Sequence, residues 1–271
     1  MLTSLLLSLT TDRPQTLPPH LGRASHALLL RLFDVADPAL AEALHTPNQP
    51  RPFTCSTLWG ARRRKGNLYL EPEKAYSIRF TGLTEPVSAQ LRMLAELPPT
   101  QVELDHVSLR VLNASLDPKA HPWAGQSTYE ALSAPHLLAR ELPSPYVEVE
   151  FAAPTAFRSA GRTVPLPLPA LVFGGLATRW NDFAPVAISD EVRRFAEECL
   201  AISRYRLKTV AVKAKGQSVQ IGFVGSCRYT ALNRDRYWLG LIQMLADYAF
   251  YAGVGYQTTA GLGQARRAVA R

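Results

Sequence analysis

The sequence has few cysteines and no long apolar run. Its three cysteines lie far apart without C-x-x-C spacing, so neither a disulfide framework nor a zinc knuckle can be read from it: Cys55, Cys199 and Cys227. No apolar stretch approaches the about 20 residues that span a bilayer. The apolar start, residues 1–10, lacks a basic region and a small-residue cleavage site, so it predicts a first strand and not a signal peptide. We therefore expect a cytoplasmic protein with no membrane contact.

Cofactor motifs are also missing. No glycine-rich segment continues into the Gly-Lys-Ser/Thr of a phosphate-binding loop, and none joins an early strand to a helix as a dinucleotide site does. None of the six histidines pairs with another at the spacing of metal ligands on a helix. Asp105-His106 reverses the order found in metal-dependent phosphohydrolases. We expect neither a metal nor a cofactor.

Positive charge is in excess. The 271 residues carry a net charge of +8, with a pI of about 9.6. Residues 141–271 hold 16 Lys or Arg against 10 Asp or Glu, whereas residues 1–140 hold 14 against 12. This balance favours a polyanionic partner held by the second half, although a basic soluble enzyme has a similar composition.

The order of predicted elements is typical of an α+β protein. In the first half, apolar patterning and caps predict strands and helices in the order β-α-β-β-α-β. A second helix begins at Asp37-Pro38 and ends near His45. The predicted strands are 2–9, 53–59, 67–70, 76–80 and 107–114, and the predicted helices are 25–33, 38–45 and 85–97.

The same order restarts in the second half. Strands are predicted at 146–151, 204–213, 218–229 and 263–270, and helices at 167–183, at 190–201 and after an Asn233 cap, with a turn at 215–217. We expect tandem ferredoxin-like (RRM-like) domains, each an antiparallel sheet with helices on one face. Their bounds are 1–120 and 146–271, with an inter-domain linker at 121–145. A single mixed α+β domain is the alternative.

A glycine-rich loop follows the last predicted helix. Residues 253–263 contain four glycines, and Arg266 and Arg267 come soon after: Gly253, Gly255, Gly261 and Gly263. Glycine lets a backbone approach a ligand closely, and consecutive exposed N–H groups suit phosphate oxygens. The sequence therefore predicts a phosphate-binding loop, or else a turn that packs a helix on a sheet.

Basic residues recur at two further places. Arg204, Arg206 and Lys208 alternate along one strand and so share a face, which with neighbouring aromatic residues suits single-stranded RNA. The run Arg62-Arg63-Arg64-Lys65 precedes Gly66 in a predicted β-turn, and is either an RNA contact or a solvated face.

His45 stands out among the histidines because it ends a predicted helix, where the helix dipole favours the imidazolium form. A proton donor near neutral pH is what RNA cleavage requires. Arg23 and Arg51 lie near it in sequence and could hold phosphate oxygens.

Four segments resemble the CRISPR-associated repeat-processing endoribonucleases of the RAMP superfamily. They are the His45 region, the segment His121-Pro-Trp-Ala-Gly125, the segment Phe151-Ala-Ala-Pro-Thr-Ala-Phe-Arg158, and the terminal glycine loop with Arg266. The glycine loop is shared with relatives that do not cleave, whereas the His45 and Phe151–Arg158 segments narrow the likeness to the processing family.

The resemblance implies metal-independent cleavage of precursor CRISPR RNA in a groove between two ferredoxin-like domains. It implies His45 as the active histidine, with Arg23 and Arg51 as the basic positions around it. Some members place a tyrosine in the first helix, where this sequence has Leu28–Phe33. His26 either compensates for that tyrosine or is a capping or surface residue.

The implied chemistry is attack by a ribose 2′-hydroxyl that leaves a 2′,3′-cyclic phosphate and a 5′-hydroxyl. RNA-binding residues are expected in the second half: Arg158, Arg204, Arg206, Lys208, Gly255, Gly261, Gly263 and Arg266. The expected partners are CRISPR repeat RNA and subunits of a CRISPR effector complex, with the chain as a monomer or homodimer. A non-cleaving RNA-binding RAMP subunit, and an enzyme that binds a phosphorylated metabolite, are the alternatives.

Overall fold

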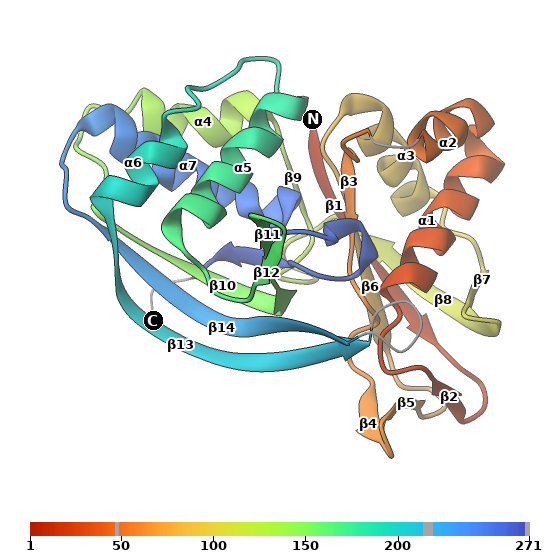
Figure 1. Ribbon diagram of the computed structural model, residues 1–271. Coiled ribbons are helices and arrows are strands. Elements are labelled where there is room, and N and C mark those ends of the chain that lie inside the picture. The colour runs from red at the N-terminus through yellow and green to blue at the C-terminus, as the bar shows by residue number, and fades with distance from the viewer. Residues whose placement is uncertain (47–48, 214–218, 269–271) are drawn as a thin grey trace. The chain divides into compact units, whose positions relative to one another are not determined.

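The computed structural model describes residues 1–46, 49–213 and 219–268 of the chain (Figure 1). The chain divides into two compact units. The first unit consists of Met1–Gln126 together with Thr259–Gly261, and the second of Ser127–Thr258 with Leu262–Arg271. The tip of the glycine-rich loop therefore belongs to the first unit, although it lies near the end of the chain.

The first unit is built on an antiparallel sheet with strand order β3-β6-β1-β8-β7 and with β9 paired to β1. Its helices are α1, α2 and α3, and the order β1-α1-β3-β6-α3-β8 is that of a ferredoxin-like domain. The bounds are β1 Leu2–Thr10, α1 Gly22–Ala36, α2 Pro38–His45, β3 Phe53–Cys55, β6 Tyr76–Gly82, α3 Glu85–Glu96, β7 Gln101–Leu104, β8 Val107–Ser115 and β9 Gly125–Ser127.

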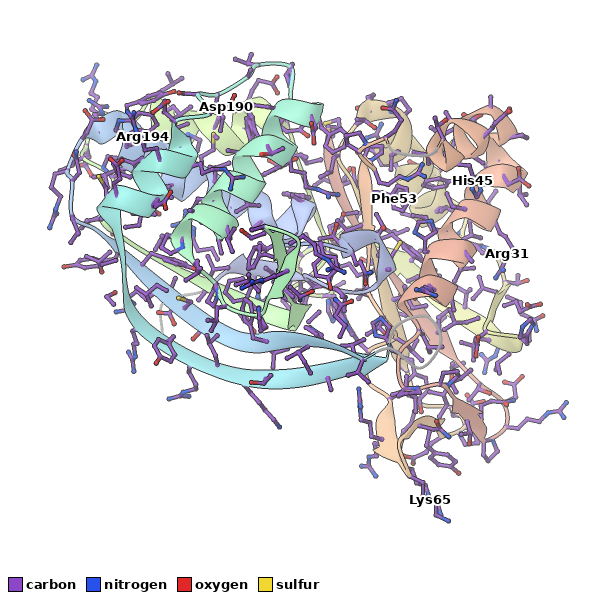
Figure 2. The ribbon with its side chains drawn as sticks, viewed as in Figure 1. Arg31, His45, Phe53, Lys65, Asp190 and Arg194 are labelled. Atoms are coloured by element: carbon purple, nitrogen blue, oxygen red, sulfur yellow. The ribbon has the colours of Figure 1, made fainter. Side chains whose placement is uncertain are left out.

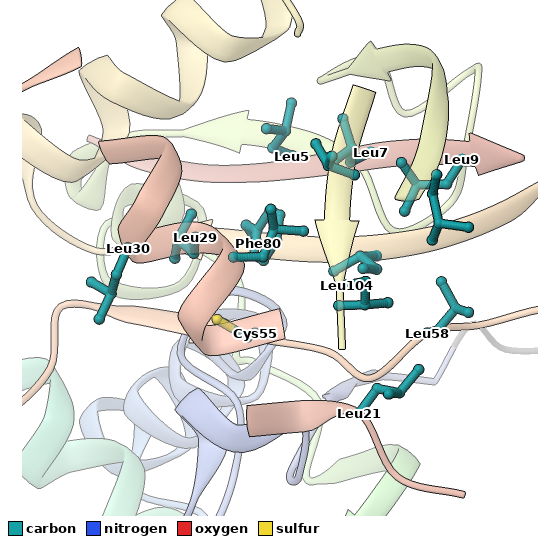
Figure 3. Packing of buried hydrophobic residues seen from close by; sticks show 14 of the residues in the cluster. Leu5, Leu7, Leu9, Leu21, Leu29, Leu30, Cys55, Leu58, Phe80 and Leu104 are labelled. Carbon is teal, nitrogen blue, oxygen red and sulfur yellow. The ribbon is translucent and has the colours of Figure 1, made fainter. Parts of the chain in front are cut away.

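The core of this unit is aliphatic. Alternate leucines of β1 point to one side of the sheet and pack with leucines of α1 (Figure 3): Leu5, Leu7, Leu9, Leu29 and Leu30. Helix α2 follows directly because Asp37 accepts a hydrogen bond from the backbone N–H of Leu40 and Pro38 fits the first turn. The packed sheet and helix fix where α1 begins and where α2 ends.

A second, small sheet of the first unit has the order β2-β5-β4. Its strands are β2 Gln15–Leu17, β4 Arg62–Arg64 and β5 Asn67–Leu70. The predicted turn is confirmed, since Lys65 and Gly66 join β4 to β5 with φ angles of 50° and 83°. Positive φ at both positions is the type I′ geometry that matches the twist of a two-residue hairpin.

The second unit repeats the topology. Its sheet has the order β13-β14-β10-β15, again antiparallel, and helices α5, α6 and α7 complete a ferredoxin-like pattern. The tandem α+β architecture is thus confirmed. The bounds are α4 Tyr129–Leu137, β10 Tyr146–Thr155, β11 Phe157–Ser159, β12 Arg162–Val164, α5 Pro169–Phe183, α6 Val192–Cys199, β13 Leu200–Lys213, β14 Val219–Ala231, α7 Arg236–Ala252, the 3₁₀ turn Thr258–Ala260 and β15 Ala265–Arg267.

Some local predictions were wrong. Helix α7 is capped by Asp235, whose carboxylate accepts from two backbone N–H groups, while Asn233 accepts from Asp235 instead. The segment 121–145, for which the sequence predicts an inter-domain linker, contains β9 and α4. The last strand spans only Ala265–Arg267. The predicted turn at 215–217 lies outside the described residues.

The segment around Trp123 is held by a buried charge. Arg79 of β6 is fully buried, and its Nε donates to Ser4 Oγ at 2.8 Å and to the Trp123 carbonyl at 3.0 Å. Its guanidinium also lies 5.0 Å from the centroid of the Trp123 ring. A buried guanidinium needs this many partners. These contacts therefore hold the His121–Gly125 segment against β6.

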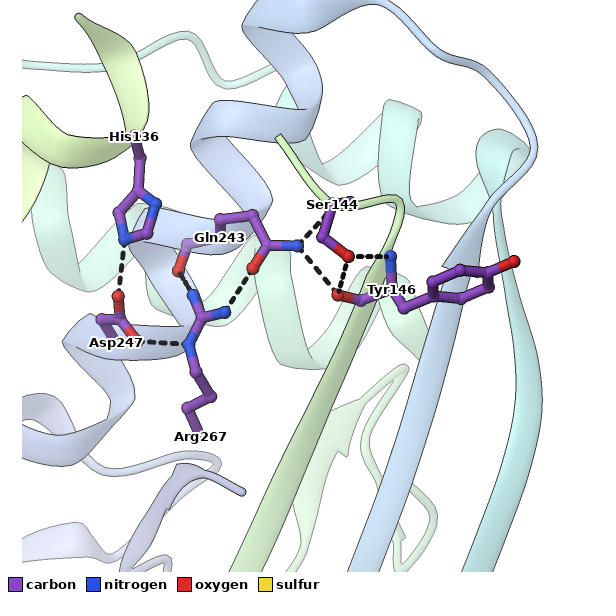
Figure 4. Close-up of polar contacts among 6 residues, drawn as sticks. All are labelled: His136, Ser144, Tyr146, Gln243, Asp247 and Arg267. Carbon is purple, nitrogen blue, oxygen red and sulfur yellow. Dashed lines mark hydrogen bonds and ion pairs between the residues drawn. The ribbon is translucent and has the colours of Figure 1, made fainter. Parts of the chain in front are cut away.

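A polar network ties the last strand of the second unit to its helices (Figure 4). Arg267 of β15 donates to the Asp247 carboxylate and to both oxygens of Gln243 on α7, and His136 of α4 bonds the other carboxylate oxygen of Asp247. Gln243 in turn donates to the carbonyl oxygens of Ser144 and Tyr146. The network holds α4, α7 and β15 together.

Candidate active site

Three candidate residues of the active site lie at or near the start of α1. His20 lies just before the helix, Arg23 is exposed in its first turn, and His26 follows on the same helix, half-buried. The ring of His26 packs against Phe53 of β3, with ring centroids 5.3 Å apart. The sheet and helix of the first unit thereby set the direction of this imidazole.

Both imidazoles contact the tip of the glycine-rich loop. His20 Nε2 lies 3.0 Å from the Ala260 carbonyl oxygen, and His26 Nδ1 lies 3.0 Å from the Thr259 carbonyl oxygen. A carbonyl oxygen can only accept, so each of these ring nitrogens carries the proton. In a neutral His26 ring the other nitrogen, Nε2, is then the acceptor.

The surroundings favour neutral rings. Burial lowers the pKa of His26 below its ordinary value, the hydrogen bond to Thr259 opposes this, and the positive charges of Arg51 and His45 lower the pKa further. Burial likewise lowers the pKa of His20, with the hydrogen bond to Ala260 opposing it and the charges of Arg63 and Arg23 adding to it. Both imidazoles therefore accept a proton less readily than a free histidine.

Helix α2 ends at His45, as the sequence predicts. The His45 side chain is exposed (Figure 2), and the guanidinium of Arg51 donates to its backbone carbonyl at 3.3 Å. The charges of His45 and Arg51 both act on His26, so these three side chains lie close enough to interact electrostatically. We call His26, His45, Arg51 and Arg23 the histidine site. These four residues are the catalytic set expected from the sequence, and the fold gathers them in the first unit.

The loop tip approaches α1 so closely that glycine is required. A Cβ on Gly22 would lie 1.8 Å from the carbonyl oxygen of Ala260, and one on Gly261 would lie 2.8 Å from the Cα of Gly22. Gly261 also has a φ of 87° and forms a bridge with Ser56. Two glycines thus let two backbones pack directly against each other beside His26.

The loop does not present its N–H groups as the sequence suggested. The N–H groups of Val254, Tyr256, Leu262 and Gly263 donate to carbonyl oxygens of the protein. An open cradle of N–H groups at these four positions was therefore a wrong expectation, because two of them bond within the loop and two bond the carbonyl oxygens of Pro154 and Ala156. Gly261 and Gly263 are buried, whereas Gly255 is exposed.

The basic row of the second unit lies on β13. Arg204, Arg206 and Lys208 are exposed and alternate along the strand. Of the ion pairs among the described residues, none involves these three side chains, whereas Arg228 and Arg266 pair with Glu148 and Glu150 on β10. Glu148 and Glu150 of this sheet are thus already paired with arginines. The three side chains of the β13 row therefore carry the unpaired positive charge of the described part of the sheet.

Arg158 is placed differently. It is exposed on β11, and its guanidinium lies 5.1 Å from the centroid of the Tyr256 ring in the glycine-rich loop. Such a stacked guanidinium keeps N–H groups at its edge for a phosphate. Whether Arg158, Arg266 and the glycines contact RNA stays a prediction.

Sequence reasoning did not find His20. A single histidine after two prolines has no local pattern, and its partner, Ala260, lies 240 positions away.

No helix within the described parts of the chain is long and apolar enough to cross a membrane. Within those same parts, no group of three or more His, Cys, Asp or Glu side chains could hold a metal ion.

Comparisons with known proteins converge. The family model "CRISPR-associated endoribonuclease Cas6" matches residues 149–265. A Cas6 protein of Thermus thermophilus, solved as a product complex, superposes with a TM-score of 0.80 at 28 % identity, covering 99 % of this chain and 100 % of that one. A second Cas6 product complex gives 0.76 at 27 % identity, with 99 % of both chains covered.

That second Cas6 protein has also been solved with a substrate mimic, where the TM-score is 0.75 at 26 % identity over 98 % of this chain and 99 % of that one. A comparison with curated proteins found no match.

Proposed function

We propose that the chain is a CRISPR repeat-processing endoribonuclease of the Cas6 group, which cleaves precursor CRISPR RNA within each repeat. The observation that carries the proposal is the histidine site. An exposed imidazole at the end of a helix, a half-buried neutral imidazole and two arginines are gathered in one unit of the Cas6-like fold.

The reaction needs no metal in this proposal, because the nucleophile is part of the substrate. The 2′-oxygen attacks the adjacent phosphorus, and the bond from phosphorus to the 5′-oxygen of the next nucleotide breaks. One proton leaves the 2′-hydroxyl and one is delivered to the 5′-oxygen. The products are a 2′,3′-cyclic phosphate and a 5′-hydroxyl.

His26 suits the role of general base. Its Nδ1 proton is committed to the Thr259 carbonyl, so Nε2 is the acceptor of the neutral ring. The lowered pKa keeps this ring neutral at pH 7. A base with a lowered pKa is more often deprotonated at the working pH than a free histidine is.

His45 suits the role of general acid. It is exposed at the carboxyl end of α2, and the guanidinium of Arg51 contacts its backbone carbonyl. Protonated His45 donates to the departing 5′-oxygen. Arg23 and Arg51 stabilise the extra charge on the phosphorane oxygens. In this proposal His26 takes the proton of the 2′-hydroxyl and His45 delivers a proton to the 5′-oxygen, whereas the sequence alone did not decide between these roles for His45.

RNA is held by the basic residues of the second unit in this proposal. The β13 row supplies Arg204, Arg206 and Lys208, and β11 supplies Arg158 beside Tyr256 of the loop. These side chains contact phosphates and position the strand without reading its bases. The partners are repeat RNA and CRISPR effector subunits, and the chain acts in the cytoplasm as a monomer or homodimer.

The deciding experiment incubates the purified protein with its cognate repeat RNA in excess chelator and maps the fragment ends. We expect cleavage at one position, with cyclic phosphate and 5′-hydroxyl ends. The His45→Ala variant should lose about two to four orders of magnitude in rate and keep RNA binding. RNA that is bound but left intact by the wild type would favour the non-cleaving RAMP subunit, and loss of cleavage in chelator would reject the metal-free mechanism.

A further inference from the structure

The hairpin of β4 and β5 in the first unit carries four consecutive cations. Arg62, Arg63, Arg64 and Lys65 are all exposed, and Lys65 lies at the tip of the hairpin (Figure 2). The hairpin is a built element: β4 pairs with β5, β5 pairs with β2, and a type I′ turn closes the tip. We call these four residues the basic hairpin.

Protection of a sheet edge does not account for this charge. β4 is an edge strand, and a charged residue on such a strand prevents pairing with other chains. One or two charges suffice for that purpose, whereas here both faces of the strand are cationic. Among the described residues a single carboxylate, Glu71, pairs with the hairpin, at 3.8 Å from Arg62, and it is shared with Lys74 at 2.6 Å.

The side chain of Arg64 is held in an orientation that suits phosphate. The guanidinium of Arg64 lies 5.3 Å from the centroid of the Tyr69 ring on the paired strand. Stacking leaves the N–H groups at the edge of the guanidinium, which is the geometry that binds a phosphate with two hydrogen bonds. Arg62 is two positions away on the same face, about 7 Å along the strand.

Arg63 links the basic hairpin to the segment that precedes α1. Its side chain leaves the other face of β4 and donates to the Pro19 carbonyl at 3.5 Å. Its charge acts on His20, as does that of Arg23. Pro19 and His20 lie just before α1, so Arg23 of the helix and Arg63 of the hairpin both place positive charge near His20.

We propose that the basic hairpin is an additional RNA-binding surface, which holds the phosphodiester backbone of the strand on one side of the cleavage position. The inference rests on the proposed function for the identity of the RNA, and it adds a contact region in the first unit to the basic row of the second. The contact is to phosphates, so it carries no base preference of its own.

The test measures binding of intact repeat RNA in a His45→Ala background, so that cleavage does not interfere. The triple substitution Arg62→Gln, Arg64→Gln and Lys65→Gln leaves Arg63 and its contact with Pro19 in place. We expect the dissociation constant to rise about tenfold or more at low salt. The slope of log affinity against log salt should fall by about 2, because each single-strand phosphate contact contributes about 0.7.

A matched control removes three exposed charges from the second unit, by Arg194→Gln, Arg234→Gln and Arg236→Gln. This variant should bind as tightly as the parent. The charge-retaining variant Arg62→Lys with Arg64→Lys should recover most of the salt slope, which a misfolded hairpin would not. An equal loss in the control variant, or an unchanged dissociation constant in the glutamine variant, would overturn the proposal.

Shortened RNAs identify the segment involved. A truncation that removes the contacted segment should weaken binding by the parent protein and abolish its difference from the glutamine variant. If the difference persisted with every truncated RNA, the effect would be a general loss of charge and the proposal would be wrong. Cleavage is read separately in the wild-type background, so a chain that binds RNA through the hairpin but never cleaves would refute the proposed function alone.

Discussion

The Nδ1 atom of His26 lies 3.0 Å from the carbonyl oxygen of Thr259, although 233 positions separate the two residues in the chain. This hydrogen bond fixes which ring nitrogen carries the proton and which is the acceptor. It also explains why the loop tip at 259–261 folds with the first unit. The end of the chain therefore completes the surroundings of a histidine near its beginning.

Substitution of His26 tests its role as the base. We expect His26→Ala to lower the single-turnover cleavage rate by about two to four orders of magnitude, with RNA binding kept. The matched control is His106→Asn, in an exposed hairpin turn with a φ of 65°, which asparagine tolerates. Near-normal cleavage by His26→Ala, measured by fragment quantification, would exclude His26 as the base.

The pH dependence follows from the lowered pKa of His26. A protonated base is inactive, so the rate should fall on the acidic side, and half of the maximal rate should be reached below pH 6.5, the ordinary value for histidine. The charge of Arg51 helps to lower this pKa, so Arg51→Gln should move the acidic limb to higher pH besides slowing the reaction.

The control for this shift is Arg31→Gln. Arg31 is exposed on α1 and its guanidinium donates to the Glu103 carbonyl, and its charge is not among those that act on His26. The acidic limb of its pH–rate profile should stay in place. A limb that moved to lower pH in Arg51→Gln would show that the sign of the electrostatic argument is wrong.

The contact between Gly22 and Ala260 is a steric requirement. A methyl group on Gly22 would lie 1.8 Å from a backbone oxygen, so Gly22→Ala must displace the loop tip or the start of α1. We expect a fall in melting temperature and a loss of cleavage, because His26 loses its Thr259 partner. Overpacking of this kind costs about 1–3 kcal/mol.

Gly175→Ala is the matched control for Gly22→Ala. Gly175 lies inside α5, where a Cβ would meet no atom within 4 Å. Alanine there should leave stability unchanged or raise it by about 0.5–1 kcal/mol. If both variants melted at the wild-type temperature, the close packing of the loop on α1 would be refuted.

The sequence was most informative where one pattern dominates an element. The leucines of β1, the Asp37-Pro38 start of α2 and the end of that helix at His45 were all predicted correctly. The strand β4 has no apolar alternation, because Arg62–Arg64 are all exposed, and it was not predicted.

Two further elements were not predicted from the sequence, for different reasons. Helix α4 contains Pro135, which usually marks a break. Strand β7, Gln101–Leu104, does alternate between exposed and buried residues, and the turn at Asp105 and His106 could have revealed it. The contacts of His20 and His26 with the loop join positions more than 230 residues apart, and no local pattern encodes them.

The last prediction concerns Asp247 in the network of the second unit. Burial opposes ionisation of this carboxyl, but the hydrogen bond from His136 and the charge of Arg267 outweigh it, so the pKa of Asp247 is lowered. A carboxyl with a lowered pKa stabilises the fold above its ordinary pKa, and that stability is lost as pH falls through the lowered value. Asp247→Asn removes the charge that faces Arg267 and His136, and should cost about 1–3 kcal/mol at pH 7.

Glu85→Gln is the comparison for Asp247→Asn. Glu85 pairs with Arg92 at an exposed position of α3, and loss of such a pair should change stability by less than about 1 kcal/mol. Denaturant unfolding at pH 7 and at pH 3 should show a deficit for Asp247→Asn that shrinks in acid, because pH 3 lies below the ordinary carboxyl pKa and the unfolded wild-type chain then binds a proton that the folded chain binds less readily. A deficit that stayed constant between the two pH values would mean that the charge of Asp247 contributes nothing, and that its hydrogen bonds alone hold β15 to α7.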